Sequence, residues 1–256
     1  MKTLAIIQAR MGSSRLPGKV MRPILGKPML WHIVNRVRLT PSIAEVVVAV
    51  PDDAANDILR KFCRDEGIKW FAGSENDVLD RFYKTALEYK GDPIIRITAD
   101  CPLADPQLID ELVEMFKTGL YDHVGVAAGA GAERFPEGRF PDGLDAECFS
   151  FAALERAWKE ATDLRDREHV TRYLWNNRQL FRCGDLKSKQ NYPGIRLTVD
   201  HADDFQLISK IYESLYQSYK PFLLDQVIEF LDNNPDLLEL NRSIAQTHSY
   251  RDVLDD

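Results

Sequence analysis

Short apolar runs alternate with segments of helical periodicity through the first 116 residues, and this alternation restricts the fold more than any other feature of the sequence. The apolar runs cover residues 4–9, 45–50, 69–71 and 93–97. Helical spacing of apolar residues is found in residues 28–38, about 79–87 and 106–116. Because strands that alternate with crossover helices form parallel pairs, this order predicts an α/β fold: a mostly parallel sheet with helices on both faces.

The pattern changes after residue 121. A short strand is predicted near Val124, and the glycine-rich stretch that follows, residues 125–143, is predicted to be a long loop. Further on we expect helices over residues 151–161, 166–177 and about 202–216, strands near 179–183 and 195–199, and two short helices within 223–240. The simplest division is one domain, residues 1–222, with an inserted lobe at about 130–193, and a helical extension of the same domain over 223–256.

Composition excludes several classes of protein. The 33 basic and 40 acidic side chains give a net charge of −7, which argues against a protein that binds nucleic acid non-specifically. No apolar stretch approaches the ~20 residues of a membrane span. The four cysteines lack the spacing of a disulfide framework or a zinc site. We therefore expect a cytoplasmic protein that interacts with neither nucleic acid nor membrane.

The loop after the first apolar run combines cations with small residues. Its cations are Arg10, Arg15 and Lys19, and the residues that open and line it are Gln8, Ala9, Gly12, Ser13 and Ser14. The carboxyl ends of strands in open α/β sheets are where ligands bind. Glycine and serine let backbone N–H groups approach a polyphosphate, and arginine and lysine neutralise its charge. The spacing differs from that of a P-loop or of a dinucleotide-binding motif. The alternative is a polar surface loop whose arginines pair with nearby acids.

Two aspartates follow predicted strands. Asp100 comes just after the strand at residues 93–97, and Asp200 closes the strand predicted at 195–199. Two carboxylates that face one site suit Mg²⁺, with water and phosphate oxygens as the remaining ligands. Each aspartate also has a structural alternative: Asp100 could open a turn, and Asp200, with Asp203, could cap the following helix.

These segments resemble the cytidylyltransferases that activate acidic sugars, namely the 3-deoxy-manno-octulosonate and acylneuraminate enzymes. The chain looks closest to the branch named after spore coat polysaccharide biosynthesis protein F. Segments 8–19 and 26–29 match the whole group, and the closer branch is matched also by segments 77–82, 141–145, 167–170 and 196–200. Gln8 replaces the proline that is usual in the sugar-acid enzymes, which favours the spore coat branch.

The resemblance implies a fold, a reaction and roles for residues. The fold would be the nucleotide-diphospho-sugar transferase α/β/α sandwich, which is GT-A-like and Rossmann-like. The reaction would convert CTP and a sugar acid to a CMP-sugar and pyrophosphate, in a homodimer that serves polysaccharide biosynthesis. Lys19, Arg15 and Arg10 would hold the phosphates, and Asp100 and Asp200 would bind Mg²⁺. Acceptor-binding residues would be Asp142, Asp145, Arg167, Glu168 and His169, although a turn and a solvated helix face explain these five equally well.

Two other functions stay open at this point. A glycosyltransferase of related fold would use a ready-made nucleotide sugar, but such enzymes usually have a D-x-D pair, and none follows a predicted strand here. A catalytically silent nucleotide-binding subunit is the second alternative, against which the presence of Lys19, Asp100 and Asp200 argues.

Overall fold

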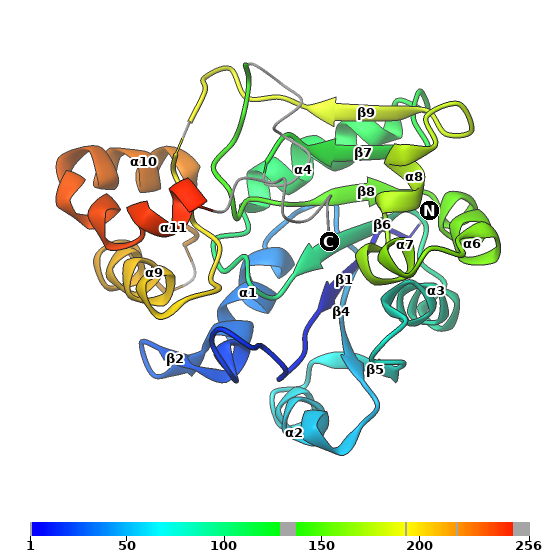
Figure 1. Ribbon diagram of the computed structural model, residues 1–256, viewed down its shortest axis with the longest axis horizontal. Helices are drawn as coiled ribbons and strands as arrows, with labels where there is room; N and C mark the ends of the chain where they lie inside the picture. Colours follow the sequence, from blue (N-terminus) through cyan, green and yellow to red (C-terminus); the bar gives the residue numbers. More distant parts are fainter. Residues whose placement is uncertain (1, 129–136, 193, 219, 248–256) are drawn as a thin grey trace.

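The computed structural model describes residues 2–128, 137–192, 194–218 and 220–247. Its core is a seven-stranded sheet with the strand order β5-β4-β1-β6-β8-β7-β9, and helices cover both faces (Figure 1). The predicted fold class, a mostly parallel sheet in an α/β sandwich, is confirmed.

One half of the sheet is parallel throughout. Its strands are β1 (Leu4–Gln8), β4 (Glu45–Pro51), β5 (Lys69–Gly73) and β6 (Ile94–Thr98). β1 lies between β4 and β6, so that Gln8 is level with Ala49 on one side and Thr98 on the other. Because both faces of β4 are covered, its side chains from Val46 onward are all buried. The carboxyl ends of β1, β4 and β6 therefore meet at one edge of the sheet.

The other half contains one reversed strand. It consists of β7 (His123–Val126), β8 (Glu147–Phe149) and β9 (Cys183–Leu186). β8 runs antiparallel to both β6 and β7, whereas β7 and β9 are parallel. β8 is only three residues long and follows the glycine-rich segment, and the sequence pattern did not predict it. β8 and β9 both lie within residues 130–193 and belong to the main sheet.

Alternate side chains of the sheet enter two separate cores. Ala5 and Ile7 point toward the core that contains α1 (Met29–Arg38), α4 (Pro106–Lys117) and α9 (Ala202–Leu215). Leu4 and Ile6 point toward the core beneath α3 (Val78–Tyr89), α6 (Phe151–Glu160) and α8 (Arg172–Asn176). The remaining short elements are η1 (Lys19–Met21), β2 (Pro23–Ile24), β3 (Lys27–Pro28), η2 (Ala54–Asn56), α2 (Asp57–Asp65), α7 (Leu164–His169), α10 (Leu224–Asn233), η3 (Pro235–Leu240) and α11 (Arg242–Thr247).

The helix predicted over residues 166–177 is in fact two helices. α7 ends at His169, and α8 begins at Arg172. Between them Val170 is fully buried and has a φ of 55°. A positive φ is a genuine outlier for a β-branched residue and costs about 1–3 kcal/mol. The break turns the chain so that Thr171 faces the sheet. Within the described residues, no helix combines the length and apolar character that crossing a bilayer requires.

Candidate active site

The first loop is closed by contacts within itself. The side chain of Leu16 is buried, and the Leu16 amide donates to the hydroxyl of Ser13 at 3.2 Å. Gly18 has a φ of 68°, and its amide donates to the carbonyl of Met11 at 3.2 Å. The exposed residues of this turn include Arg10, Gly12, Ser14 and Arg15. Small residues and cations are thus presented together at the carboxyl end of β1, as the motif predicts.

Lys19 lies between the two predicted metal ligands. Its Nζ is 3.2 Å from Asp100 Oδ2, 2.9 Å from Asp200 Oδ1 and 2.7 Å from the carbonyl oxygen of Val199. Burial by itself lowers the pKa of Lys19, but the two carboxylates more than offset this effect and raise it. Arg15 adds a second cation, with Nη2 3.2 Å from Asp200 Oδ1. The structure therefore brings Arg15, Lys19, Asp100 and Asp200 together in one place, which we call the Lys19 centre.

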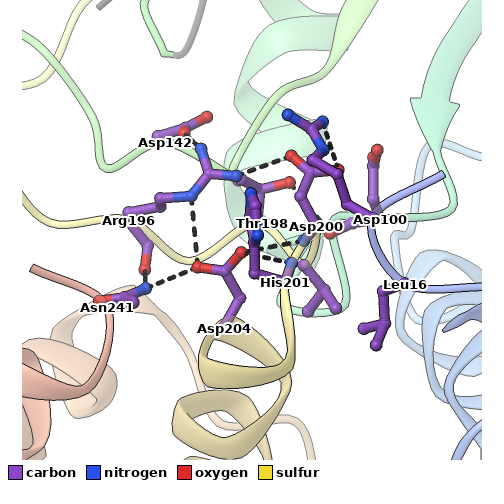
Figure 2. Close-up of polar contacts among 12 residues, drawn as sticks. Leu16, Asp100, Asp142, Arg196, Thr198, Asp200, His201, Asp204 and Asn241 are labelled. Atoms are coloured by element: carbon purple, nitrogen blue, oxygen red, sulfur yellow. Dashed lines mark hydrogen bonds and ion pairs between the residues drawn. The ribbon is translucent and has the colours of Figure 1, made fainter. Parts of the chain in front are cut away.

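A buried arginine holds Asp200 from behind (Figure 2). Arg196 donates through Nη2 to Asp200 Oδ2 at 2.7 Å and through Nη1 to Asp142 Oδ2 at 2.7 Å. Its Nε is 3.3 Å from Asp204, a fully buried carboxylate that also accepts a hydrogen bond from Asn241. Burial disfavours the charged form of Asp200, yet the surrounding cations, Lys19 foremost, lower its pKa to about 2. Asp200 is consequently a fixed anion at neutral pH.

The strand predicted over residues 195–199 does not form. Only an isolated bridge joins Arg196 to Asp142, and the segment follows the loops at the end of the sheet. The Val199 amide donates to the carbonyl of Asp100 at 2.8 Å, and the Leu197 amide donates to that of Asp142 at 2.7 Å. The alternating apolar residues of this segment are buried in the core, but its backbone amides bond to loop residues and not to a neighbouring strand. Asp200 and Asp100 still converge, as predicted, because both contact Lys19 Nζ.

Asp200 is also not a helix cap. The N-cap of α9 is His201. Asp204 accepts from the backbone amides of Asp200 and His201 at 3.0 and 2.9 Å, which satisfies the free amides at the start of this helix. The side chain of Asp200 is left to face the cations.

A glycine turn places two more aspartates beside this centre. Gly143 has a φ of 99°, and a Cβ atom here would collide with the backbone of Leu197 and Thr198. The Asp145 carboxylate accepts from the Gly143 amide at 3.0 Å. Burial, followed by the charge of Asp142, raises the pKa of Asp145 to about 7. Asp142 and Asp145 thus adjoin the centre, and their role toward an acceptor stays a prediction.

A row of polar side chains crosses four strands on the α3 face of the sheet. Arg96 of β6 donates through Nε to Gln8 Oε1 at 3.1 Å and through Nη1 to Glu147 Oε2 at 2.6 Å. The Nε2 of His123 is 3.0 Å from Glu147 Oε1, and the Thr171 hydroxyl donates to Glu147 Oε2 at 2.8 Å. We call Gln8, Arg96, Glu147, His123 and Thr171 the polar row.

The three residues of segment 167–169 lie in different environments. Arg167 binds Asp77, the N-cap of α3, with contacts of 2.5–3.0 Å, and donates to the Trp158 carbonyl at 2.7 Å. This arginine joins α7 to α3. Glu168 is exposed. His169 has its pKa lowered by burial and then by the charge of Arg96, a member of the polar row. Their assignment to an acceptor is untested.

Known proteins identify the family. Residues 4–250 match the family model described as Cytidylyltransferase. The chain belongs to the cytidylyltransferase family. It is 33% identical over 241 residues to spore coat polysaccharide biosynthesis protein SpsF of Bacillus subtilis, covering 91% of this chain and 95% of that protein. It is 34% identical over 113 residues to the 3-deoxy-manno-octulosonate cytidylyltransferase of Geobacter metallireducens, 44% of each chain.

A solved cytidylyltransferase has the same fold. The structure from Leptospira borgpetersenii serovar Hardjo-bovis superposes with a TM-score of 0.84 at 28% identity, covering 93% of this chain and 97% of that one. Together with the sequence matches, this confirms the resemblance to cytidylyltransferases and to the spore coat branch. The family assignment makes this chain a nucleotidyltransferase.

The residues of the Lys19 centre fit a divalent cation. Asp100 and Asp200 each place an oxygen within 3.2 Å of one positive atom, Lys19 Nζ, so they already share a cation. Both ligands are hard carboxylate oxygens, as Mg²⁺ prefers, and they leave positions for water and phosphate. Groups of three or more His, Cys, Asp or Glu side chains with metal-binding geometry are absent from the described part of this cytidylyltransferase.

The sequence did not reveal the buried residues that hold the site residues in place. Arg96 and Glu147 lie in the polar row, and Arg196 and Asp204 lie behind Asp200. A signal existed for Arg96, because it interrupts the apolar run Ile94–Ile97, and a charge inside a buried strand of a cytidylyltransferase requires a partner. Glu147 and Asp204 offered no such signal, since their partners come from distant segments.

Proposed function

We propose that this protein transfers CMP from CTP to a small sugar acid with release of pyrophosphate, and that the product serves surface polysaccharide biosynthesis. The observation that carries the proposal is the position of Lys19 between Asp100 and Asp200, beside the exposed cations of the first loop. The names of the relatives, a spore coat polysaccharide protein and an octulosonate cytidylyltransferase, support the acceptor class. We further propose a homodimer in the cytoplasm, where the four free thiols would stay reduced.

The proposed reaction is an in-line substitution at phosphorus. An acceptor hydroxyl oxygen forms a bond to the α-phosphorus of CTP, the bond from that phosphorus to the bridging β-phosphate oxygen breaks, and the hydroxyl proton is released. Positioning and charge neutralisation account for most of the rate in such transfers. The first loop supplies backbone amides and the cations Arg10 and Arg15 for the triphosphate. Lys19 neutralises the departing pyrophosphate.

Asp100 and Asp200 would hold Mg²⁺ in this reaction. When bound there, the ion would neutralise phosphate charge and make the acceptor hydroxyl more acidic. Arg196 keeps Asp200 oriented and ionised for this task. Asp142 and Asp145 would accept hydrogen bonds from acceptor hydroxyls.

The test is pyrophosphate release, measured with each of the four ribonucleoside triphosphates, with and without Mg²⁺. Acceptors should include sugar acids, sugar phosphates and neutral sugars. We expect Mg²⁺-dependent release with CTP and one sugar acid, reduced at least ~100-fold in Asp100→Asn. Asp203→Asn, an exposed acid in the first turn of α9, is the matched control and should keep its turnover.

Other outcomes would contradict the proposal in distinct ways. Transfer of a glycosyl group from a nucleotide sugar, without pyrophosphate release from CTP, would favour a glycosyltransferase. Tight Mg²⁺-dependent binding of CTP without turnover on any acceptor would favour a silent subunit. Full activity of Asp100→Asn would remove Asp100 from the mechanism.

A further inference from the structure

The polar row is an unusual feature for the interior of a sheet. Arg96 and Glu147 are cross-strand partners in β6 and β8, and only 17% and 18% of their side chains are exposed. Next to them Gln8 ends β1, directly before the first loop. Burying a pair of charges costs desolvation energy that their attraction often does not recover. A purely structural explanation for the row is therefore weak, and a ligand is a stronger one.

Besides the buried Nδ1 of His123, which has no partner, two N–H groups of the row have no acceptor in the described part of the chain. Arg96 uses Nε for Gln8 and Nη1 for Glu147, which leaves Nη2. Gln8 accepts through Oε1, so its amide is turned with Nε2 free to donate. Neither nitrogen is among the buried polar atoms that lack a partner, so both reach accessible surface. Gln8 and Arg96 thus present two donors side by side to a ligand.

The charges of the row leave a positive excess. Arg96 and His123 both contact one anion, Glu147. Burial alone would lower the pKa of His123, but Cys183 and Glu147 raise it to about 9, and the pKa of Glu147 is lowered to about 2, chiefly by Arg96 against the effect of burial. Asp145, the nearby acid with its pKa raised to about 7, adds at most partial negative charge at neutral pH. Two cations against one fixed anion favour an anionic ligand.

The backbone around the row is also held in a costly conformation. Val170, at a φ of 55°, lies between His169 and Thr171. Thr171 donates to Glu147, and the charge of Arg96 lowers the pKa of His169 after burial does. Strain of this kind persists where the surroundings enforce it, which is common at ligand sites. The break between α7 and α8 thus sets Thr171 against Glu147 of the row.

We propose that Gln8 Nε2 and Arg96 Nη2 bind the carboxylate of the acceptor, with Glu147, His123 and Thr171 as positioning residues. This inference rests on the proposed function and names residues for its acceptor specificity. In a 2-ulosonic acid the attacking hydroxyl and the carboxylate are attached to the same carbon, so the carboxylate must bind close to the reacting phosphorus. Arg96 is the third residue of β6 and precedes Asp100 by four positions, and Gln8, the last residue of β1, precedes the phosphate loop. The two donors are therefore in the required neighbourhood.

A measurement of acceptor binding tests this proposal independently of turnover. The full-length protein, saturated with the non-hydrolysable analogue α,β-methylene-CTP and Mg²⁺, is titrated calorimetrically with 3-deoxy-manno-octulosonate, its 8-amino analogue and N-acetylneuraminate, each beside its C1 amide. We expect one acid to bind at least tenfold more tightly than its amide. Arg96→Met should abolish this preference, and Gln8→Leu, which leaves the Arg96–Glu147 pair intact, should reduce it several-fold. Binding of α,β-methylene-CTP is measured for each variant first, so that every acid and its amide are compared at saturating nucleotide analogue.

Arg36→Met is the matched control. Arg36 is more deeply buried than Arg96, donates to the carbonyls of Ala104 and Phe222 at 2.9 and 2.8 Å, and extends from α1 on the opposite face of the sheet. It should lose stability and keep the preference for the acid. If Arg96→Met does not fold, Gln8→Leu and Arg96→Lys decide the question, since the lysine keeps the charge but cannot reach both partners in the fork geometry of arginine.

The outcomes distinguish this site from the proposed reaction. Equal binding of every acid and its amide to the wild type, or no binding of any acid, overturns the carboxylate site, as does an unchanged preference in both Gln8→Leu and Arg96→Met. Pyrophosphate release with a neutral sugar or a sugar phosphate alone would keep CMP transfer and overturn this inference. Selective binding of an acid without pyrophosphate release would keep the carboxylate site and contradict the proposed reaction.

Discussion

The Lys19 centre and the polar row are both clusters of charged side chains at the same end of the sheet, but they are built from different parts of the fold. The centre takes its residues from loops: the first loop, the loop after β6 and the segment before α9. The row takes Gln8, Arg96, Glu147 and His123 from four strands. The side chain of Asp100 is 32% exposed, whereas that of His123 is 2% exposed.

Because of this difference, the ion-pair partners in the Lys19 centre can be exchanged for ligands, whereas those in the polar row are fixed by the sheet. Lys19 reaches its two aspartates with a flexible side chain, so phosphate and metal ions can replace these partners without disturbing the sheet. Arg96 and Glu147 are held by the hydrogen-bond ladder between β6 and β8, and removing either one leaves the other buried without a partner. We therefore expect substitutions in the centre to affect turnover and substitutions in the row to affect stability as well as specificity.

The largest effect is expected for Lys19→Ala. Loss of the cation that neutralises the leaving group should lower turnover at least ~100-fold, the usual scale for a preorganised electrostatic group. Steady-state pyrophosphate release measures this effect, and thermal unfolding should show a change of only a few degrees. Lys27→Ala, at an exposed pair with Glu66, is the control and should retain activity. Unfolding of Lys19→Ala with loss of the whole structure would mean that the centre is as fixed as the row.

The next effect is expected for Glu147→Gln, measured as the free energy of unfolding in urea at pH 7. The substitution leaves Arg96 and His123 without their common anion in a buried position. Breaking a buried pair in this way costs about 3 kcal/mol. The matched control is Glu213→Gln in the exposed pair with Lys210, where a loss below about 0.5 kcal/mol is expected. Equal losses in the two variants would show that solvent reaches the row freely.

Sequence patterns predicted the elements around the centre better than those around the row. Alternating apolar runs indicated β1, β4 and β6, and the spacing of cations in the first loop identified Lys19 together with its surroundings. These signals are local, since each depends on residues within about a dozen positions of each other. The convergence of Asp100 and Asp200 was also predicted, because both follow buried apolar runs.

The row could not be predicted in this way, because its members are distant in sequence and each has an ordinary local context. Glu147 lies in a three-residue strand whose direction is reversed, and only the finished sheet places it opposite Arg96. The strand predicted at residues 195–199 failed for a related reason: alternation reports burial, whereas strand formation also needs a backbone partner. Arg167 is a further example, since its partner Asp77 is 90 residues away and is brought to it only when α7 packs on α3.

The smallest effect concerns Asp200, in the Lys19 centre, and Asp145, which adjoins it. The pKa values of these two aspartates move in opposite directions. Burial and Asp142 raise the pKa of Asp145 to about 7, whereas the cations around Asp200 lower its pKa to about 2 in spite of burial. An unfolded aspartate titrates near ~3.9. Between about pH 4 and pH 7 the folded protein therefore keeps a proton on Asp145 that the unfolded chain has lost, and stability from this residue falls as the pH rises through that window.

Asp145→Asn removes this ionisation, so its stability relative to the wild type should rise as the pH increases from 4 to 8, and the difference should vanish near pH 4. Asp200→Asn should show the opposite sign, because the stability contributed by ionised Asp200 is present above pH ~4 and lost only as the pH falls toward 2. Urea unfolding of Asp145→Asn at pH 4, 6 and 8, and of Asp200→Asn at pH 2.5, 3.5 and 6, measures the two slopes. If Asp145→Asn instead loses stability at pH 8, then its carboxylate is ionised and held by cations, and the border of the centre is as strongly cationic as the centre itself.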